Sequence, residues 1–201
     1  MALENKLGLT SSADLDREEE CISKKKALEL FEKGILDSLP AGKFSTLQTI
    51  HKYLFEDIYD FVGNLRTVNL AKENFQFAPL MYLETALENI NKMPQSTFDE
   101  IVEKYVEMNI AHPFRDGNGR STRIWFDHVL KNEIGKVIDW SKVYKEDYLL
   151  AMERSSIKDI EIKVILKNEL TDEIDSREVY MKGIDHSYYY EGYITFKTEE
   201  L

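Results

Sequence analysis

The strongest restriction on the fold comes from one short run of the chain, His112-Pro113-Phe114-Arg115-Asp116-Gly117-Asn118-Gly119-Arg120-Ser121-Thr122-Arg123. Apolar residues recur at helical spacing on both sides of it, which predicts one helix that ends at His112 and a second that begins after the glycines. Gly135 is placed to end the second helix. The run is therefore expected to form a tight loop that leads into a helix N-terminus.

This arrangement of residue types suits a polyphosphate ligand. Gly117 and Gly119 permit positive φ angles and close approach of a ligand, so backbone N–H groups can turn inward as an anion nest. The unpaired N–H groups and the positive dipole end of the following helix add to the same site. Arg120 and Arg123 lie three residues apart in its first turn, and we expect them to contact two phosphate groups.

Two further side chains of the run can carry chemistry. Asp116 would repel phosphate unless a cation lay between them, which makes it a candidate ligand of Mg²⁺. His112 has an ordinary pKa that suits a general base near neutral pH. The alternative roles are structural: a core histidine satisfied by hydrogen bonds, and a carboxylate that caps the following helix.

The run resembles the Fic-domain signature, His-x-Phe-x-Asp/Glu-Gly-Asn-Gly-Arg-x-x-Arg, at every specified position. A gapless pattern of this kind is far more specific than a glycine-rich loop alone. Fic enzymes are mostly adenylyltransferases, which move AMP from ATP to a Ser, Thr or Tyr hydroxyl of a target protein. The resemblance implies that His112 takes the proton of that hydroxyl and that Asp116 holds Mg²⁺. It assigns the phosphates of ATP to the rest of the run: Gly117, Asn118, Gly119, Arg120 and Arg123.

Charge and cysteine content exclude several other classes of protein. The chain carries a formal net charge of -11 at pH 7, whereas nucleic-acid binding needs a basic face. Its single cysteine, Cys21, can form no intrachain disulfide and no zinc finger. The N-terminal residues lack the apolar core of a signal peptide, and no segment of the sequence approaches the length of a membrane span. We therefore expect a cytoplasmic protein with neither a nucleic-acid nor a membrane partner.

The periodic pattern predicts a compact all-α domain, and the resemblance implies that this domain is of the Fic type. Residues 1–22 are expected to form an extension or a first helix, and residues 23–184 the Fic domain itself. The strongest helical periodicity covers residues 45–62, with Ser45 as N-cap and Gly63 after the last turn. Further helices are expected over residues 79–92, from residue 96 or 97 to His112, around 143–152 and around 157–166.

Residues 66–78 interrupt the helical pattern and predict a small β-hairpin. Apolar and polar residues alternate up to Leu70, before a polar segment at 72–74. They alternate again after it, with Phe75 and Phe77 as the apolar ones. The position of this hairpin resembles that of the Fic flap, which lies beside the active site and pairs with the target backbone as an added strand. The resemblance implies that Leu70, Phe75 and Phe77 help to dock the target.

The segment Ser187-Tyr188-Tyr189-Tyr190-Glu191-Gly192 resembles the inhibitory motif of many Fic proteins, Ser/Thr-x-x-x-Glu-Gly/Asn. In one subclass, short single-domain bacterial proteins, the motif lies on a C-terminal helix, and this chain looks most like that subclass. Residues 185–201 are expected to form this helix and a tail. The resemblance implies that Glu191 reaches Arg123 and takes the place of an outer phosphate, while Ser187 helps to fix the helix. The three tyrosines are expected to be core contacts.

The resemblance to Fic proteins thus implies a self-inhibited protein adenylyltransferase that uses ATP with Mg²⁺. A second hypothesis is that the same site catalyses the reverse reaction, in which Glu191 positions water and the protein removes AMP from modified targets. Kinase-like transfer, as in the Doc toxins of the family, is disfavoured because those proteins replace the second glycine, whereas this chain keeps Gly119. Transfer of UMP or phosphocholine stays open.

The non-enzymatic alternative is a nucleotide-responsive binding module, in which the anion site senses ATP and the terminal helix signals to a partner. Such a module has no need of a base at His112. The sequence identifies neither the target protein nor the preferred metal, and it leaves homo-oligomerisation open.

Overall fold

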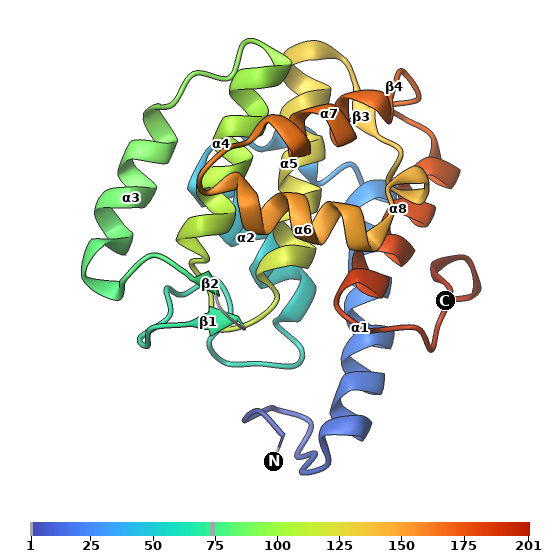
Figure 1. Cartoon of the computed structure of the whole chain (residues 1–201). Coiled ribbons are helices and arrows are strands. Elements are labelled where there is room, and N and C mark those ends of the chain that lie inside the picture. Colours follow the sequence, from blue (N-terminus) through green and yellow to red (C-terminus); the bar gives the residue numbers. More distant parts are fainter. Residues whose placement is uncertain (1, 73–74) are drawn as a thin grey trace.

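The computed structural model describes residues 2–72 and 75–201, and most of them are helical (Figure 1). The helices are α1 (Ser12–Glu32), α2 (Phe44–Phe55), α3 (Leu80–Lys92), α4 (Phe98–Ala111), α5 (Asn118–Ile134), α6 (Lys145–Ser155), α7 (Ile160–Asn168) and α8 (Arg177–Tyr190). Two short antiparallel strand pairs accompany them, β1 (Ala71–Lys72) with β2 (Phe75–Gln76) and β3 (Val137–Ile138) with β4 (Leu170–Thr171). The predicted all-α class is confirmed.

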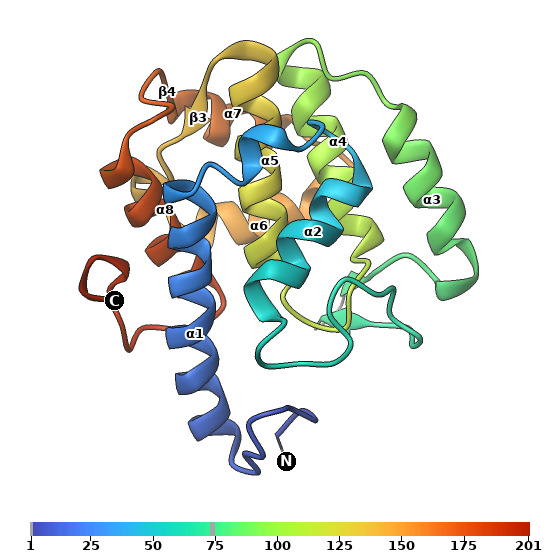
Figure 2. The same cartoon turned by 180° about the vertical axis from the view of Figure 1, so that it is seen from behind.

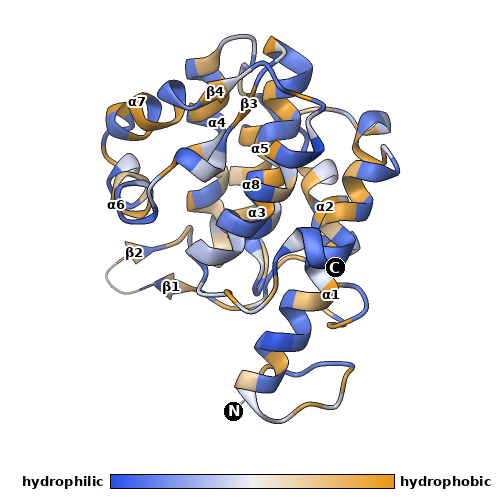
Figure 3. Cartoon of the chain, turned by 90° about the vertical axis from the view of Figure 1, so that its right-hand side faces the viewer, coloured by the Kyte–Doolittle hydropathy of each residue, from blue (hydrophilic) through white to orange (hydrophobic). Residues whose placement is uncertain are grey.

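Helix α5 runs through the centre of the molecule, and α2, α4 and α8 pack against it (Figures 1 and 2). Its consecutive residues Trp125 and Phe126 are both buried, so it contributes to the core on more than one face. Tyr105 of α4 stacks on Phe126 with ring centroids 4.2 Å apart, and the Trp125 indole donates to the Lys43 carbonyl (3.0 Å). The surrounding helices carry both hydrophilic and hydrophobic residues, as expected for helices that bury one face (Figure 3).

The helices on either side of the central run end where the sequence predicts. Thr97 caps α4 and forms a capping box with Glu100, in which each side chain accepts from the other residue's backbone N–H. His112 is the C-cap of α4 and has a left-handed backbone (φ 47°), and Gly135 is the C-cap of α5 in the same conformation (φ 64°). The two later helices, α6 and α7, begin two to three residues after the predicted starts.

The helix predicted over residues 45–62 is shorter than expected. It starts at Phe44, so Lys43 rather than Ser45 is its N-cap, and it ends at Phe55. Beyond Phe55 the chain turns back, because the Ile58 N–H bonds to the Phe55 carbonyl (2.9 Å) and the Ile58 carbonyl accepts from the Lys6 N–H (2.8 Å). The apolar positions after Phe55 therefore pack from a loop, which periodicity alone cannot distinguish from a helix.

The two terminal helices are longer than the sequence boundaries implied. Helix α1 begins after Ser11, whose hydroxyl accepts from the Asp14 N–H (3.3 Å), and it continues without a break through the boundary expected at residues 22–23. Helix α8 begins after Ser176, whose hydroxyl accepts from the Val179 N–H (3.3 Å), and ends at Tyr190. Glu191 is therefore the C-cap of α8, and the rest of the segment expected over 185–201 is a tail with one 3₁₀ turn (Thr198–Glu200).

The predicted flap, residues 66–78, forms a hairpin with a shorter ladder than expected. Ala71 pairs with Gln76 and Lys72 with Phe75, and the Phe77 N–H bonds to the Leu70 carbonyl (3.2 Å). The predicted turn extends over residues 73–74, which lie outside the described residues. The β3–β4 pair was not predicted, because its two strands are separated in sequence by α6 and α7.

Within the part of the chain that the structure describes, no helix combines the length and the apolarity that a membrane span requires.

Candidate active site

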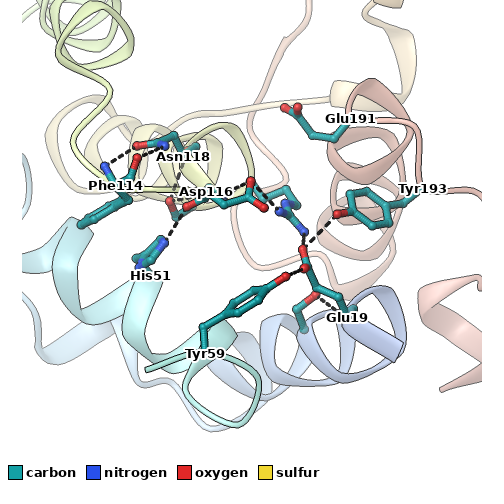
Figure 4. A network of polar contacts seen from close by, with 12 residues as sticks. Glu19, His51, Tyr59, Phe114, Asp116, Asn118, Glu191 and Tyr193 are labelled. Carbon is teal, nitrogen blue, oxygen red and sulfur yellow. Dashed lines mark hydrogen bonds and ion pairs between the residues drawn. The ribbon is translucent and has the colours of Figure 1, made fainter. Parts of the chain in front are cut away.

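The loop between α4 and α5 is held in shape by the side chain of Asn118. Its Oδ1 accepts from the Phe114 N–H (2.9 Å), and its Nδ2 donates to the Phe114 carbonyl (2.9 Å), as Figure 4 shows. Both residues are buried. The side chain of Asn118 is therefore engaged within the loop, and only its backbone N–H remains for the anion contact that the sequence predicted.

Replacing Asn118 by alanine is expected to destabilise the protein. The substitution leaves the buried N–H and carbonyl of Phe114 without partners, and unmade buried hydrogen bonds cost about 1–3 kcal/mol. Urea denaturation should show this loss in the free energy of unfolding, whereas Asn89→Ala on the exposed face of α3 should change it little. Equal stability of the two variants would contradict the role assigned to Asn118.

A second support of the loop is His51 of α2, which the sequence analysis did not single out. Its imidazole stacks on Phe114 (ring centroids 3.8 Å apart) and its Nε2 bonds to the Asp116 carbonyl (2.8 Å). Its Nδ1 accepts from the Gly63 N–H (3.0 Å), so the proton of the neutral ring lies on Nε2. Burial lowers the pKa of His51 to about 4. The only local signal is a polar residue on the apolar face of a helix.

Protonation of His51 is expected to destabilise the fold below about pH 6.5. The pKa is 6.5 when the chain is unfolded and about 4 when it is folded, so the unfolded state binds more protons between these values. The free energy of unfolding should therefore fall with decreasing pH, with His51 contributing about 2 kcal/mol of the loss by about pH 5. Urea denaturation of the wild type should show this steeper decline relative to His51→Gln. Parallel pH profiles would be inconsistent with it.

The two glycines of the run serve different purposes. Gly117 is the N-cap of α5 and has a left-handed backbone (φ 73°), and a Cβ there would lie 2.5 Å from the Phe55 ring. Gly119 lies inside the first turn of α5 and, contrary to expectation, needs no positive φ. A Cβ on Gly119 would lie 2.3 Å from Glu191 Oε1. Gly119 therefore leaves the space that the Glu191 carboxylate occupies.

The C-terminal motif meets the central run at Arg123. Its Nη2 donates to Glu191 Oε1 (2.8 Å) and to the Ser187 carbonyl (2.9 Å), and its Nε donates to Ser187 Oγ (2.7 Å). The Arg123 side chain is 4% exposed and that of Glu191 is 27% exposed. Burial alone would raise the pKa of Glu191, but the charges of Arg123, Arg120 and Lys72 lower it to about 2. The carboxylate is therefore ionised at neutral pH.

Of the three tyrosines, Tyr188 and Tyr190 are buried as predicted, and Tyr189 is 44% exposed.

Arg120 does not face an open phosphate site in this arrangement. Its guanidinium is buried and forms an ion pair with Glu19 of α1, and it lies over the rings of Phe55 and Tyr193. Glu19 also accepts from the Tyr59 and Tyr193 hydroxyls, so residues from α1, α5 and the C-terminal tail meet at one carboxylate (Figure 4). No sequence pattern singles out Glu19, because it belongs to a run of acidic residues that is typical of a solvated helix face.

His112 lies at the C-terminal end of α4, facing the flap. Its ring stacks on Phe77 of the flap, with centroids 3.6 Å apart and an interplanar angle of 16°. Burial lowers the pKa of His112 to about 4, so the imidazole is neutral at pH 7 and can accept a proton. Phe77, predicted to dock the target, thus covers the candidate base, while Leu70 and Phe75 are half-buried in the same hairpin.

Asp116 is the candidate metal ligand, and its position and exposure fit that role. Its side chain is 47% exposed at the N-terminus of α5, where Oδ1 accepts from the Gly117 N–H (2.6 Å). Among residues 2–72 and 75–201 there is no group of three or more histidine, cysteine or acidic side chains placed to hold a metal. A single carboxylate nevertheless suits Mg²⁺, which keeps several waters and binds through one or two carboxylates together with substrate phosphates.

Comparison with known proteins identifies the part of the chain that contains this site. The model of the Fic/DOC family matches residues 43–130. The protein adenylyltransferase VbhT of Bartonella schoenbuchensis is 32% identical over 169 residues, which cover 77% of this chain and 33% of VbhT. A probable protein adenylyltransferase Fic of Escherichia coli is 27% identical over 66% of this chain and 71% of its own length. The chain thus spans about one third of VbhT.

Solved structures agree with the helical architecture. The N-terminal FIC domain of Bep8 from Bartonella sp. 1-1C superposes with a TM-score of 0.72 at 17% identity, covering 86% of this chain and 92% of that domain. BepC from Bartonella tribocorum, solved with bound AMPPNP, gives a TM-score of 0.68 at 19% identity, covering 85% of this chain and 93% of BepC. At these identities the likeness concerns the fold. The family match over residues 43–130 and the 32% identity to VbhT support a Fic-domain protein, and the solved structures share its fold.

Proposed function

We propose that this chain is a self-inhibited protein adenylyltransferase, which transfers AMP from ATP to a hydroxyl group of a target protein. The observation that carries the proposal is the position of Glu191. Its carboxylate is bound by Arg123 above the first turn of α5, beside the base His112 and the flap. The names of the relatives, protein adenylyltransferases, support the same activity.

In the proposed reaction, His112 accepts the proton of the target hydroxyl. The hydroxyl oxygen then forms a bond to the α-phosphorus of ATP, and the bond from that phosphorus to the bridging oxygen of the pyrophosphate breaks. A pKa of about 4 keeps His112 neutral before the reaction, so no proton has to leave the ring first. The N–H groups at the start of α5 and the helix dipole favour the polyphosphate at this place.

Asp116 would hold Mg²⁺ at the N-terminus of α5, where its carboxylate is exposed. When bound, the ion would neutralise charge on the phosphates and so favour departure of pyrophosphate. Arg123 is the arginine that can contact an outer phosphate, but only when Glu191 has left it. Arg120, which is paired with Glu19, instead fixes α5 to α1 and to the tail.

Inhibition follows from competition for one guanidinium. Glu191 Oε1 accepts from Arg123 at the position that the sequence resemblance assigns to a phosphate oxygen, and it brings a negative charge close to the bound nucleotide. ATP would then be displaced or held with its α-phosphorus out of line with the attacking oxygen. Activation requires the end of α8 to move, which is a two-state equilibrium that ligands can shift.

Removal of AMP by the same site is the second enzymatic reading. It needs Glu191 to accept a proton from water, whereas the contact with Arg123 lowers the pKa of Glu191 to about 2. A carboxylate with so low a pKa is a weak base. The observed geometry thus favours the inhibitory role, and the assay below includes the other reading as an outcome.

The test is a labelling assay with Mg²⁺ and ATP carrying the label on either the α- or the γ-phosphate. The wild type and its Glu191→Gly variant are each incubated alone and with a bacterial lysate, and protein-bound label is counted. Transfer of the α-label alone supports adenylyl transfer, and transfer of the γ-label alone would identify a kinase and overturn the proposal. With neither transfer, release of AMP from pre-adenylylated protein would identify the reverse reaction, while ATP binding without turnover would leave a binding module.

A further inference from the structure

The C-terminal end of α4, which carries His112, is completed by residues of the flap. A helix leaves its last four carbonyls without partners inside the helix. Here the Ile110 carbonyl accepts from the Ala78 N–H (2.9 Å). The carbonyls of Ala111 (3.2 Å) and His112 (2.8 Å) accept from the guanidinium of Arg66. The end of α4 is therefore bound to both ends of the flap.

Arg66 also holds the flap itself together. Its Nη1 donates to the Val68 carbonyl (2.7 Å), its Nη2 donates to the Ala78 carbonyl, and its backbone N–H bonds to the Pro113 carbonyl (2.8 Å). The side chain is 3% exposed, and its partners among the described residues are backbone carbonyls rather than carboxylates. The negative end of the α4 dipole compensates part of the buried charge.

We propose that Arg66 is a positioning residue, which joins the flap and the general base His112 into one rigid unit. This inference rests on the proposed function, because it explains how a hydroxyl docked on the flap meets the base in a fixed geometry. The guanidinium bonds to two carbonyls within the flap and to two at the end of α4, while Phe77 of the same flap stacks on the His112 ring. Movement of the flap would therefore displace Phe77 from the His112 ring.

The guanidinium group is suited to this role in a way that an ammonium group is not. Arginine presents its donors as a rigid planar fork, so one side chain can reach several carbonyls at fixed angles. Lysine at position 66 would keep the charge but could not reproduce that arrangement. His112 also has a left-handed backbone (φ 47°), which is uncommon for a residue with a side chain and persists where its surroundings hold it.

The kinetic test compares Arg66→Lys and Arg66→Gln with their parent, all carrying Glu191→Gly so that self-labelling from α-labelled ATP is fast enough to follow. We expect the maximal rate of self-labelling to fall about 10- to 100-fold, because a displacement near 1 Å at a reacting group has effects of this size. The KM for ATP should stay unchanged, because the contacts of Arg66 do not include a residue of α5. A rise in the KM for ATP with the maximal rate unchanged would overturn the proposal.

A second readout does not depend on activity. In the chain with Glu191 intact, the NMR signals of the His112 ring should titrate near pH 4. In the Arg66 variants the His112 signals should shift, and the pH midpoint of their titration should move toward 6.5 as Phe77 uncovers the ring. The signals of the His128 ring, which bonds to the Leu39 carbonyl (3.1 Å) and forms no hydrogen bond with Arg66, serve as the internal reference for the titration.

The matched control is Lys104→Gln, which removes a different buried cation, one that lies on α4 itself. Lys104 donates to Gln95 (2.5 Å) and the Met93 carbonyl (3.4 Å) in the first half of the helix, away from His112. If the Arg66 variants only lose thermal stability, as Lys104→Gln should, and keep the rate and the His112 titration of the parent, Arg66 is merely structural. If Glu191→Gly does not label itself, the proposed function fails, and the His112 titration still decides the role of Arg66.

Discussion

Replacing Glu191 by glycine should increase the incorporation of α-label from ATP by about 100-fold, the effect expected when a misaligned phosphate is allowed to reach its reactive position. The substitution removes the carboxylate that accepts from Arg123 Nη2 and lies against Gly119. Arg123 keeps its contacts with Ser187, so its guanidinium stays in place and one donor becomes free for a phosphate. The measurement is the initial rate of self-labelling at fixed ATP.

The same substitution at Glu199 is the matched control, since this exposed glutamate lies in the same terminal segment. Its labelling should equal that of the wild type. Calorimetry should in addition show tighter ATP binding by Glu191→Gly. An unchanged labelling rate in Glu191→Gly, together with unchanged ATP affinity, would refute the inhibitory role of Glu191.

Removing the base has the opposite effect, and of comparable or larger size. His112→Asn in the Glu191→Gly background should lower α-label incorporation by about 10²- to 10⁴-fold, the usual contribution of a general base. Asparagine is the better choice than alanine here, because His112 has a left-handed backbone (φ 47°) and asparagine tolerates that conformation. The loss can then be assigned to the imidazole rather than to a strained loop.

His186→Asn provides the control for this experiment, because His186 is a half-buried histidine of α8 outside the site. It should label like its parent. ATP binding by His112→Asn should also be retained, because the phosphate contacts proposed for α5 do not involve the imidazole. Labelling that survives in His112→Asn would show that another group takes the proton of the hydroxyl.

The pairing of Glu191 with Arg123 also distinguishes the two ways in which a carboxylate can act in such a site. A carboxylate that is ionised and bound by a guanidinium competes with phosphate. A carboxylate that is released from the guanidinium could instead accept a proton from water. The pKa of about 2 places Glu191 in the first condition as long as Arg123 is its partner. Any activity in AMP removal would therefore require a rearrangement around Arg123, which is the same event that would admit ATP.

Features of the fold and the site that depend on neighbouring residues could be predicted from the sequence. The ends of α4 and α5 follow from the Thr97–Glu100 capping box and from Gly135, and the order of His112, Asp116 and Gly117 follows from a contiguous motif. The contact of Glu191 with Arg123 was also predicted, but from a second motif whose meaning depends on the first. Local rules suffice for these features because capping and helix periodicity act within one or two turns.

The side chains that support the site could not be predicted in this way, because they come from segments far apart in the sequence. Arg66 reaches the carbonyl of a residue 46 positions away, His51 one 65 positions away, and Glu19 pairs with an arginine 101 positions away. Each of these residues lies in a segment whose own pattern indicates a β-hairpin, an apolar helix face or a solvated acidic run. Their roles arise when packing brings α1, α2 and the flap around the start of α5, where burial makes an unpartnered polar group costly.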